Sequence, residues 1–197
     1  MSEIGGRMGL QHQTGSVWWE SLAAFFTDAG VGVLYAALAV CWWRARRLPS
    51  QDMARAVLAP LGVLATWLIS SGLKLLVAAE RPCQTPAVRA LVDCPPAGDW
   101  SFPSNHAALA AACAVGIACA WRVLAVPAGV LAVAVAASRV VVGVHYPLDV
   151  VAGLLVGSAT AAAVVLGLSV PATRTIDRFR AHPRLKYLVA DSPVDDD

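Results

Sequence analysis

The segment SRVVVGVHYPLD, residues 138–149, joins two long apolar runs and carries an arginine, a histidine and an aspartate. Arg139 lies near the end of the first run, His145 follows six residues later, and Asp149 stands at the start of the second run. Such groups are costly at the edge of a membrane, so their presence there indicates a functional site. A carboxylate one helical turn after a histidine can also orient the ring and make it more basic.

The composition around this segment is that of a membrane protein. Of the 197 residues, 58% are hydrophobic and 14% are charged, and the mean hydropathy is +0.63. Soluble domains carry about 25% charged residues, and about 17–25 apolar residues cross a bilayer as a helix. We therefore predict an all-α fold, a polytopic bundle of transmembrane helices.

The hydropathy pattern predicts five spans, at about residues 29–43, 56–79, 104–120, 123–142 and 147–170. Residues 15–28 are aromatic and amphipathic but carry Glu20 and Asp28, so we expect a separate helix there that lies at the interface. That helix could be counted as a sixth span. The predicted organisation is a polar and interfacial segment at 1–28, a transmembrane domain at 29–170 and a tail at 171–197.

Basic residues predict how the spans are oriented. The densest basic loop is RARRLPSQDMAR, residues 44–55, and the tail is also rich in arginine. Cytoplasmic loops carry an excess of Lys and Arg, so both segments are expected in the cytoplasm. The segment 138–149 and the polar loop 80–103 then share the extracytoplasmic face of a multi-pass protein of the plasma membrane.

Two cysteines of the chain share that polar loop. Cys83 and Cys94 could form a disulfide if the loop faces an oxidising compartment, and otherwise they are free thiols; both alternatives stay open. The other cysteines fall in apolar runs, where small buried residues are the ordinary interpretation. No Cys or His spacing typical of a metal site is present, so none is predicted.

Two cations flank the end of the second span. Lys74 lies within the span, and Arg81 follows seven residues later, directly before Pro82. Seven residues are about two helical turns, so both side chains are expected on one helix face. The ordinary alternatives are a lysine that extends to the interface and a plain loop arginine.

The third span begins with a polar motif, SFPSNHA, residues 101–107. Ser104 suits an N-cap, and the first backbone N–H groups of the helix then form a site for an anion. A capped helix with a stray His106 is the alternative. Arg139 lies alone in its apolar run and needs an anionic partner, for which phosphate is the obvious candidate. Asp149 alone could be a simple acid at a helix N-terminus.

Taken together, these motifs resemble the three-part pattern of the type 2 phosphatidic acid phosphatase family. The pattern comprises Lys74 to Pro82, then Pro103-Ser104-Asn105-His106, then Ser138 to Asp149, in the expected order and spacing. Asn105 stands where glycine is commonest in the family. An asparagine or aspartate there resembles the polyprenyl diphosphate phosphatase branch more than the phosphatidate branch.

The resemblance implies a mechanism and a substrate. His145 would attack phosphorus and form a phosphohistidine, Asp149 would orient its ring, and His106 would protonate the leaving oxygen and later activate water. The phosphoryl oxygens would be bound by the polar and cationic residues of the motifs, which are Lys74, Arg81, Ser104, Asn105 and Arg139. No metal or other cofactor is implied.

The implied partners are the membrane and a lipid phosphate, with no nucleic acid. The preferred substrate is a polyprenyl diphosphate of the undecaprenyl or decaprenyl type, hydrolysed to the monophosphate during recycling of the carrier lipid for cell-wall synthesis. Phosphatidate or phosphatidylglycerophosphate is the alternative substrate. A transporter or channel would more often show repeated halves, and the sequence has no internal repeat.

Overall fold

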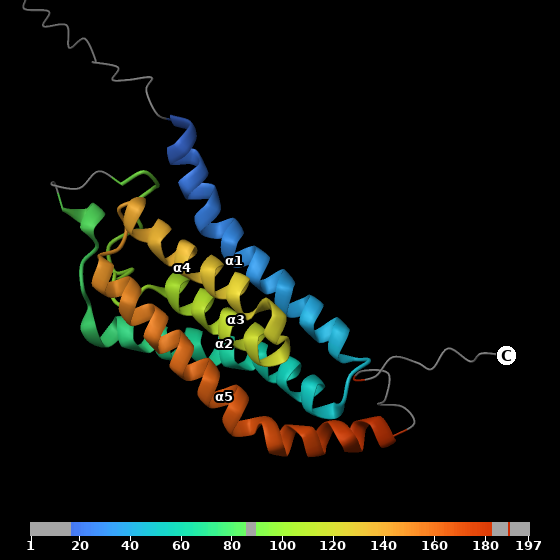
Figure 1. The fold of residues 1–197 in the computed structure, drawn as a ribbon. Coiled ribbons are helices and arrows are strands. Elements are labelled where there is room, and N and C mark those ends of the chain that lie inside the picture. The colour runs from blue at the N-terminus through green and yellow to red at the C-terminus, as the bar shows by residue number, and fades with distance from the viewer. Residues whose placement is uncertain (1–16, 86–89, 183–188, 190–197) are drawn as a thin grey trace, which may run out of the picture.

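The computed structural model describes residues 17–85, 90–182 and 189, and within them the chain is all-α, with no strand (Figure 1). Five α-helices follow one another as α1 Val17–Ala45, α2 Ser50–Val77, α3 Asn105–Ala120, α4 Ala125–Val141 and α5 Pro147–Ala181. Two 3₁₀ turns, η1 Pro82–Gln84 and η2 Arg122–Leu124, lie between them. Four segments are long and apolar enough to cross a membrane: Phe25–Ala45, Ser50–Gln84, Arg122–Val141 and Pro147–Ala181. The predicted polytopic helical bundle is confirmed.

Helix α3 is the short central element of the bundle. Its 16 residues rise about 24 Å, less than the roughly 30 Å of a hydrocarbon core. It lies among the other four helices and contacts each of them (Figure 1). Ten of its 16 residues are buried, and seven of these are alanines. The other helices surround α3, so its polar N-terminus at Asn105 lies inside the protein, at one end of the bundle. We call this end the site end.

Helices α3 and α5 approach each other closely where both begin. A Cβ added to Gly153 would lie 2.5 Å from the carbonyl oxygen of Ser104. A Cβ added to Gly157 would lie 2.0 Å from the carbonyl oxygen of Ala108. Small residues at such spacing let helix backbones pack together in a membrane. This contact fixes the start of α5 against the start of α3.

The structure differs from the sequence expectation at the ends of two helices. Helix α1 continues without a break from Val17 through residue 28, so the interfacial segment and the first span form one helix. Two of its polar residues have partners in the bundle: Thr27 is hydrogen-bonded to Ser138 and Asp28 to His106. Helix α5 extends to Ala181 with Pro171 inside it and bends toward its end (Figure 1), as proline in a helix often causes. The first part of the expected tail is thus helical.

Candidate active site

The predicted site residues come from four separate segments that meet at the site end. These are the C-terminal part of α2 with the following loop, the N-terminus of α3, the end of α4 and the start of α5. The backbone N–H of Ser104 donates to the carbonyl oxygen of Asp149 at 3.0 Å, which joins two of the motifs directly. Gly143, with φ of 80°, turns the chain after α4 and brings His145 back into the bundle.

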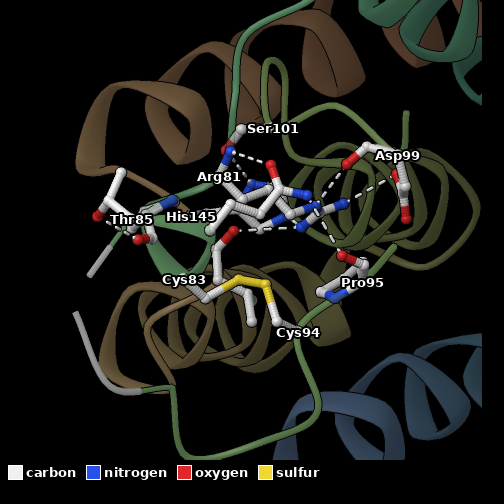
Figure 2. Close-up of a disulfide and its surroundings, with 11 residues drawn as sticks. Arg81, Cys83, Thr85, Cys94, Pro95, Asp99, Ser101 and His145 are labelled. Carbon is white, nitrogen blue, oxygen red and sulfur yellow. Dashed lines mark hydrogen bonds and ion pairs between the residues drawn. A yellow bond between two sulfur atoms is a disulfide. The ribbon is translucent and has the colours of Figure 1, made fainter. Parts of the chain in front are cut away.

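His145 lies at the centre of the cluster and is only 3% exposed. Arg81 Nη1 lies 3.1 Å from its Nε2, and because a guanidinium can only donate, Nε2 must present its lone pair. The proton of the neutral ring is therefore on Nδ1. This atom lies 3.3 Å from Ser101 Oγ and 3.6 Å from Asp149 Oδ2. Figure 2 shows His145 grouped with Arg81 and Ser101, near the Cys83–Cys94 disulfide.

The ionisation of His145 follows from its surroundings. Burial lowers the pKa of His145 to about 4. The hydrogen bond to Asp149 opposes this shift, and the positive charges of Arg81, Arg139 and Lys74 add to it. The imidazole is therefore neutral at pH 7, with an available lone pair on Nε2.

Asp149 has two roles that the sequence presented as alternatives. Its Oδ2 accepts the backbone N–H of Tyr146 at 2.8 Å, so it caps the start of α5. The same oxygen accepts the hydroxyl of Ser101 and faces His145. Ser101 thereby bridges the histidine and the aspartate. The sequence analysis quoted Ser101 but gave it no function.

Lys74 and Arg81 converge, but not because they share a helix face. Helix α2 ends at Val77, and Ala78 follows with a left-handed φ of 47°, so the helical argument for this pair was wrong. The two side chains meet instead on Asp99, whose Oδ1 lies 3.1 Å from Lys74 Nζ and 2.9 Å from Arg81 Nη2. Burial of Asp99 tends to raise its pKa, but these two cations outweigh burial and lower it. Asp99 was absent from the predicted site.

His106, at the start of α3, contacts a different helix. Its Nε2 lies 3.0 Å from Oδ1 of Asp28 on α1. The side chain of His106 is 35% exposed and that of Asp28 is 78% exposed. His106 lies within electrostatic range of Arg139 and Arg81, so it belongs to the same cluster as His145. The sequence had shown Asp28 only as an acid in an apolar helix.

Two buried polar atoms of the cluster are left without hydrogen-bond partners. Among the described residues, Ser104 Oγ and Arg139 Nε are buried and make no hydrogen bond. Ser104 is the predicted N-cap of α3, yet its hydroxyl makes no capping bond. Buried polar atoms are normally paired, so these two indicate a site for an anion that accepts their protons. Asn105 Oδ1 accepts the hydroxyl of Ser70 at 2.6 Å, which leaves the amide NH₂ able to donate.

The disulfide that the sequence left open is present (Figure 2). Cys83 and Cys94 are bonded, with their Cα atoms 5.8 Å apart. The bond joins η1, next to Arg81, to the segment that leads to Asp99. Cys41 and Cys113 are buried free thiols. In the part of the chain that the structure describes, no group of three His, Cys, Asp or Glu residues could hold a metal ion.

Fold and site together define a class of protein, a multi-pass helical membrane protein with ionisable residues clustered at one end of the bundle. The model of the PAP2 superfamily matches residues 55–170, more than half of the chain, and the chain therefore belongs to that superfamily. It is a lipid phosphate phosphatase and a hydrolase of the membrane.

A solved structure shares the fold. It is described as the first transmembrane PAP2-type phosphatidylglycerolphosphate phosphatase from Bacillus subtilis. The likeness has a TM-score of 0.56 and 24% identity, and it covers 82% of this chain and 80% of that one. No curated protein matches the chain.

Proposed function

We propose that this cluster hydrolyses its lipid phosphate through a phosphohistidine on His145. The observation that carries the proposal is the state of the ring: Nε2 presents a lone pair toward Arg81, while Nδ1–H faces Ser101 and Asp149. Nε2 attacks phosphorus, and the bond from phosphorus to the leaving oxygen breaks as the N–P bond forms. Asp149 stabilises the positive charge that develops on the ring.

His106 supplies the proton of the first step and removes one in the second. It protonates the leaving oxygen, and its neutral ring then takes a proton from the water that attacks the phosphohistidine. The N–P bond breaks, phosphate leaves and His145 is neutral again. His106 suits this exchange because its side chain is 35% exposed and lies in the first turn of α3, at the end of the bundle.

The phosphoryl oxygens are bound by donors that the structure leaves available. Arg139 Nε and Ser104 Oγ have no partner among the described residues, and the first N–H groups of α3 adjoin them. Arg81 Nη1, which now donates to His145, can donate to a phosphoryl oxygen once substrate arrives. Lys74 and the Asn105 amide complete the set. Such preorganised donors stabilise charge that grows in the transition state.

The proposed substrate is a polyprenyl diphosphate, hydrolysed to the monophosphate in carrier-lipid recycling for cell-wall synthesis. Asn105 supports this choice, because it stands where the resemblance to the polyprenyl branch lies and its NH₂ is free to donate. Phosphatidate or phosphatidylglycerophosphate is the second candidate. In its favour, the solved structure with the same fold is described as a phosphatidylglycerolphosphate phosphatase.

The site end is proposed to face the extracytoplasmic side of the plasma membrane. The Cys83–Cys94 disulfide supports this, because such bonds persist in oxidising compartments. The arginines of residues 44–55 support it from the opposite end. An impermeant thiol reagent should fail to label Arg47→Cys in intact cells, and labelling from outside would reverse the orientation.

Phosphate release from detergent-solubilised protein in EDTA tests the function. A polyprenyl diphosphate, phosphatidate and phosphatidylglycerophosphate are offered side by side, with His145→Ala as the test variant and His182→Ala as a histidine control away from the cluster. We expect release from the polyprenyl diphosphate, unchanged by EDTA and by His182→Ala but lost in His145→Ala. Preference for a glycerolipid would be compatible with the phosphohistidine mechanism but would contradict a role in carrier-lipid recycling. Full activity of His145→Ala would exclude the phosphohistidine.

A further inference from the structure

We propose that Asp28 on α1 is a positioning residue for His106, one that holds Nε2 and so assigns proton transfer to Nδ1. The inference rests on the proposed function, in which His106 is the general acid and base. Its basis is the 3.0 Å contact between Asp28 Oδ1 and His106 Nε2, which joins residues 78 positions apart in the sequence. None of the three sequence motifs includes α1, so this contact adds a fifth segment to the four that form the site.

The position of Asp28 is fixed by the packing of α1 on α4. The adjacent residue, Thr27, is buried and hydrogen-bonded to Ser138 of α4. A Cβ added to Gly30 would lie 2.4 Å from a methyl group of Val135, so α1 and α4 run close together just beyond Asp28. Asp28 itself lies in the apolar span Phe25–Ala45, where a carboxylate is costly without a function.

The contact determines which ring nitrogen of His106 exchanges protons. A carboxylate only accepts hydrogen bonds, so Nε2 keeps its proton and donates it to Asp28. Nδ1 has no hydrogen-bond partner among the described residues, and it is the nitrogen left to act. In the first step Nδ1–H gives its proton to the leaving oxygen, which takes the electron pair of the broken P–O bond. In the second step Nδ1 accepts a proton from the attacking water.

Asp28 also balances the charges around the acid. Burial, and after it the charges of Arg139 and Arg81, disfavour the protonated form of His106, whereas Asp28 favours that form. The packing of α1 on α4 depends on Thr27 and Gly30 and not on the Asp28 carboxylate, whose side chain is 78% exposed. We therefore expect loss of Asp28 to weaken acid catalysis far more than it weakens the fold.

The dependence on the leaving group separates acid catalysis from other effects. An alkoxide needs a proton as it leaves, whereas p-nitrophenolate leaves without one. Dodecyl phosphate and p-nitrophenyl phosphate serve as the two probes, with the full-length protein in detergent. We expect Asp28→Asn to lower kcat/KM, which reports the first step alone, by about 10- to 100-fold for dodecyl phosphate and by less than about threefold for p-nitrophenyl phosphate, because general acid catalysis contributes about 10²–10⁴-fold. His106→Ala should show the same pattern, and Asp28→Glu should restore part of the loss.

Asp177→Asn is the matched control, because this exposed aspartate lies near the far end of α5. It should change neither rate. Equal losses of Asp28→Asn on both probes, or no loss on either, would overturn the role of Asp28. Failure of the wild-type protein to hydrolyse any phosphate would instead reject the proposed function.

The tautomer of His106 gives a second test that does not depend on activity. Nitrogen-15 spectra of histidine-labelled protein should show neutral His106 protonated at Nε2. In Asp28→Ala that preference should be lost, with the circular dichroism spectrum and Tm retained. A wild-type ring protonated at Nδ1, or an unchanged tautomer in Asp28→Ala, would overturn the proposal even if the variant were inactive.

Discussion

The two histidines of the site differ in how the bundle holds them. His145 is 3% exposed and is in contact with Arg81 and Ser101, from the loop between α2 and α3, and with Asp149 at the start of α5. The side chain of His106 is 35% exposed and, within the described residues, has a single hydrogen-bond partner, Asp28, on a neighbouring helix. A nucleophile gains from a fixed ring and a dry environment, whereas an acid that must regain its proton gains from contact with water. The difference in burial matches the proposed division of labour.

Removal of either histidine ring should cause the largest loss of activity, and the two losses should differ. His145→Ala is expected to lower kcat by about 10⁴-fold or more, as for loss of a nucleophilic triad. His106→Ala should cost less, about 10²–10⁴-fold in kcat/KM with an alkyl phosphate and little in kcat/KM with an aryl phosphate, because kcat/KM reports the first step alone. Rapid-quench assays with ³²P-labelled substrate should trap a phosphoprotein in His106→Ala but none in His145→Ala. A phosphoprotein in the latter variant would contradict the assignment.

The pH profile should distinguish the two rings as well. His145 attacks only when neutral, and its pKa is lowered to about 4, so the active form persists well below pH 6. We expect log kcat/KM for p-nitrophenyl phosphate to turn down only near pH 4, with a slope that approaches one per pH unit below it. The same acid limb should remain in His106→Ala. A limb near pH 6.5, where an unperturbed histidine titrates, would contradict the buried, cation-flanked environment of His145.

The relative position of the two rings depends on the contact between α3 and α5. A Cβ at position 157 would lie 2.0 Å from the backbone oxygen of Ala108, so Gly157→Ala must displace one helix. We expect it to destabilise the fold by about 1–3 kcal/mol, as overpacking does, and to lower Tm and kcat together. Gly167→Ala is the control on the same helix, since nothing lies within 4 Å of its added Cβ. It should gain up to about 1 kcal/mol from helix propensity.

An unchanged Tm in Gly157→Ala would contradict the close packing of α3 on α5. A lower Tm with full activity would show that the alignment of the two histidine-bearing segments does not depend on this contact. Thermal unfolding in detergent, monitored by circular dichroism, gives Tm, and the phosphate-release assay gives the activity.

Local patterns in the sequence located the apolar helices, except that they divided α1 in two, and they singled out three motifs that the structure brings together at the site end. Hydropathy located the spans, and the position of Ser104 before an apolar run predicted the start of α3. Local patterns could not predict which residues contact the motif residues in the folded protein. Asp28 lies 78 residues from His106, and Ser101 lies 44 residues from His145, so no periodicity connects them. Packing of α1 on α4 and the fold of the loop before α3 create both contacts.

For Lys74 and Arg81, the sequence argument correctly placed the two side chains together but gave the wrong structural reason. Their spacing suggested one continuous helix, but α2 ends at Val77 and the loop folds back. Asp99, 18 residues beyond Arg81, then gathers both cations. Electrostatic attraction to a carboxylate, and not helical periodicity, brings the two side chains together.

Removal of the Ser101 hydroxyl should have the smallest effect and should sharpen the contrast between the two rings. This hydroxyl donates to Asp149 Oδ2 and lies 3.3 Å from His145 Nδ1, so Ser101→Ala removes a bridge but keeps both catalytic groups. We expect kcat to fall about tenfold, since one hydrogen bond to a charged group contributes roughly 1.5–3 kcal/mol, part of which a water molecule can replace. Ser169→Ala, which removes an exposed hydroxyl bound to Leu166 on α5, should leave kcat unchanged. Because Ser101 acts on the ring of the nucleophile and not on the acid, its loss should be equal for alkyl and aryl phosphates. A loss confined to alkyl phosphates would instead show that Ser101 acts through His106. It would contradict the assignment of separate roles to the two histidines.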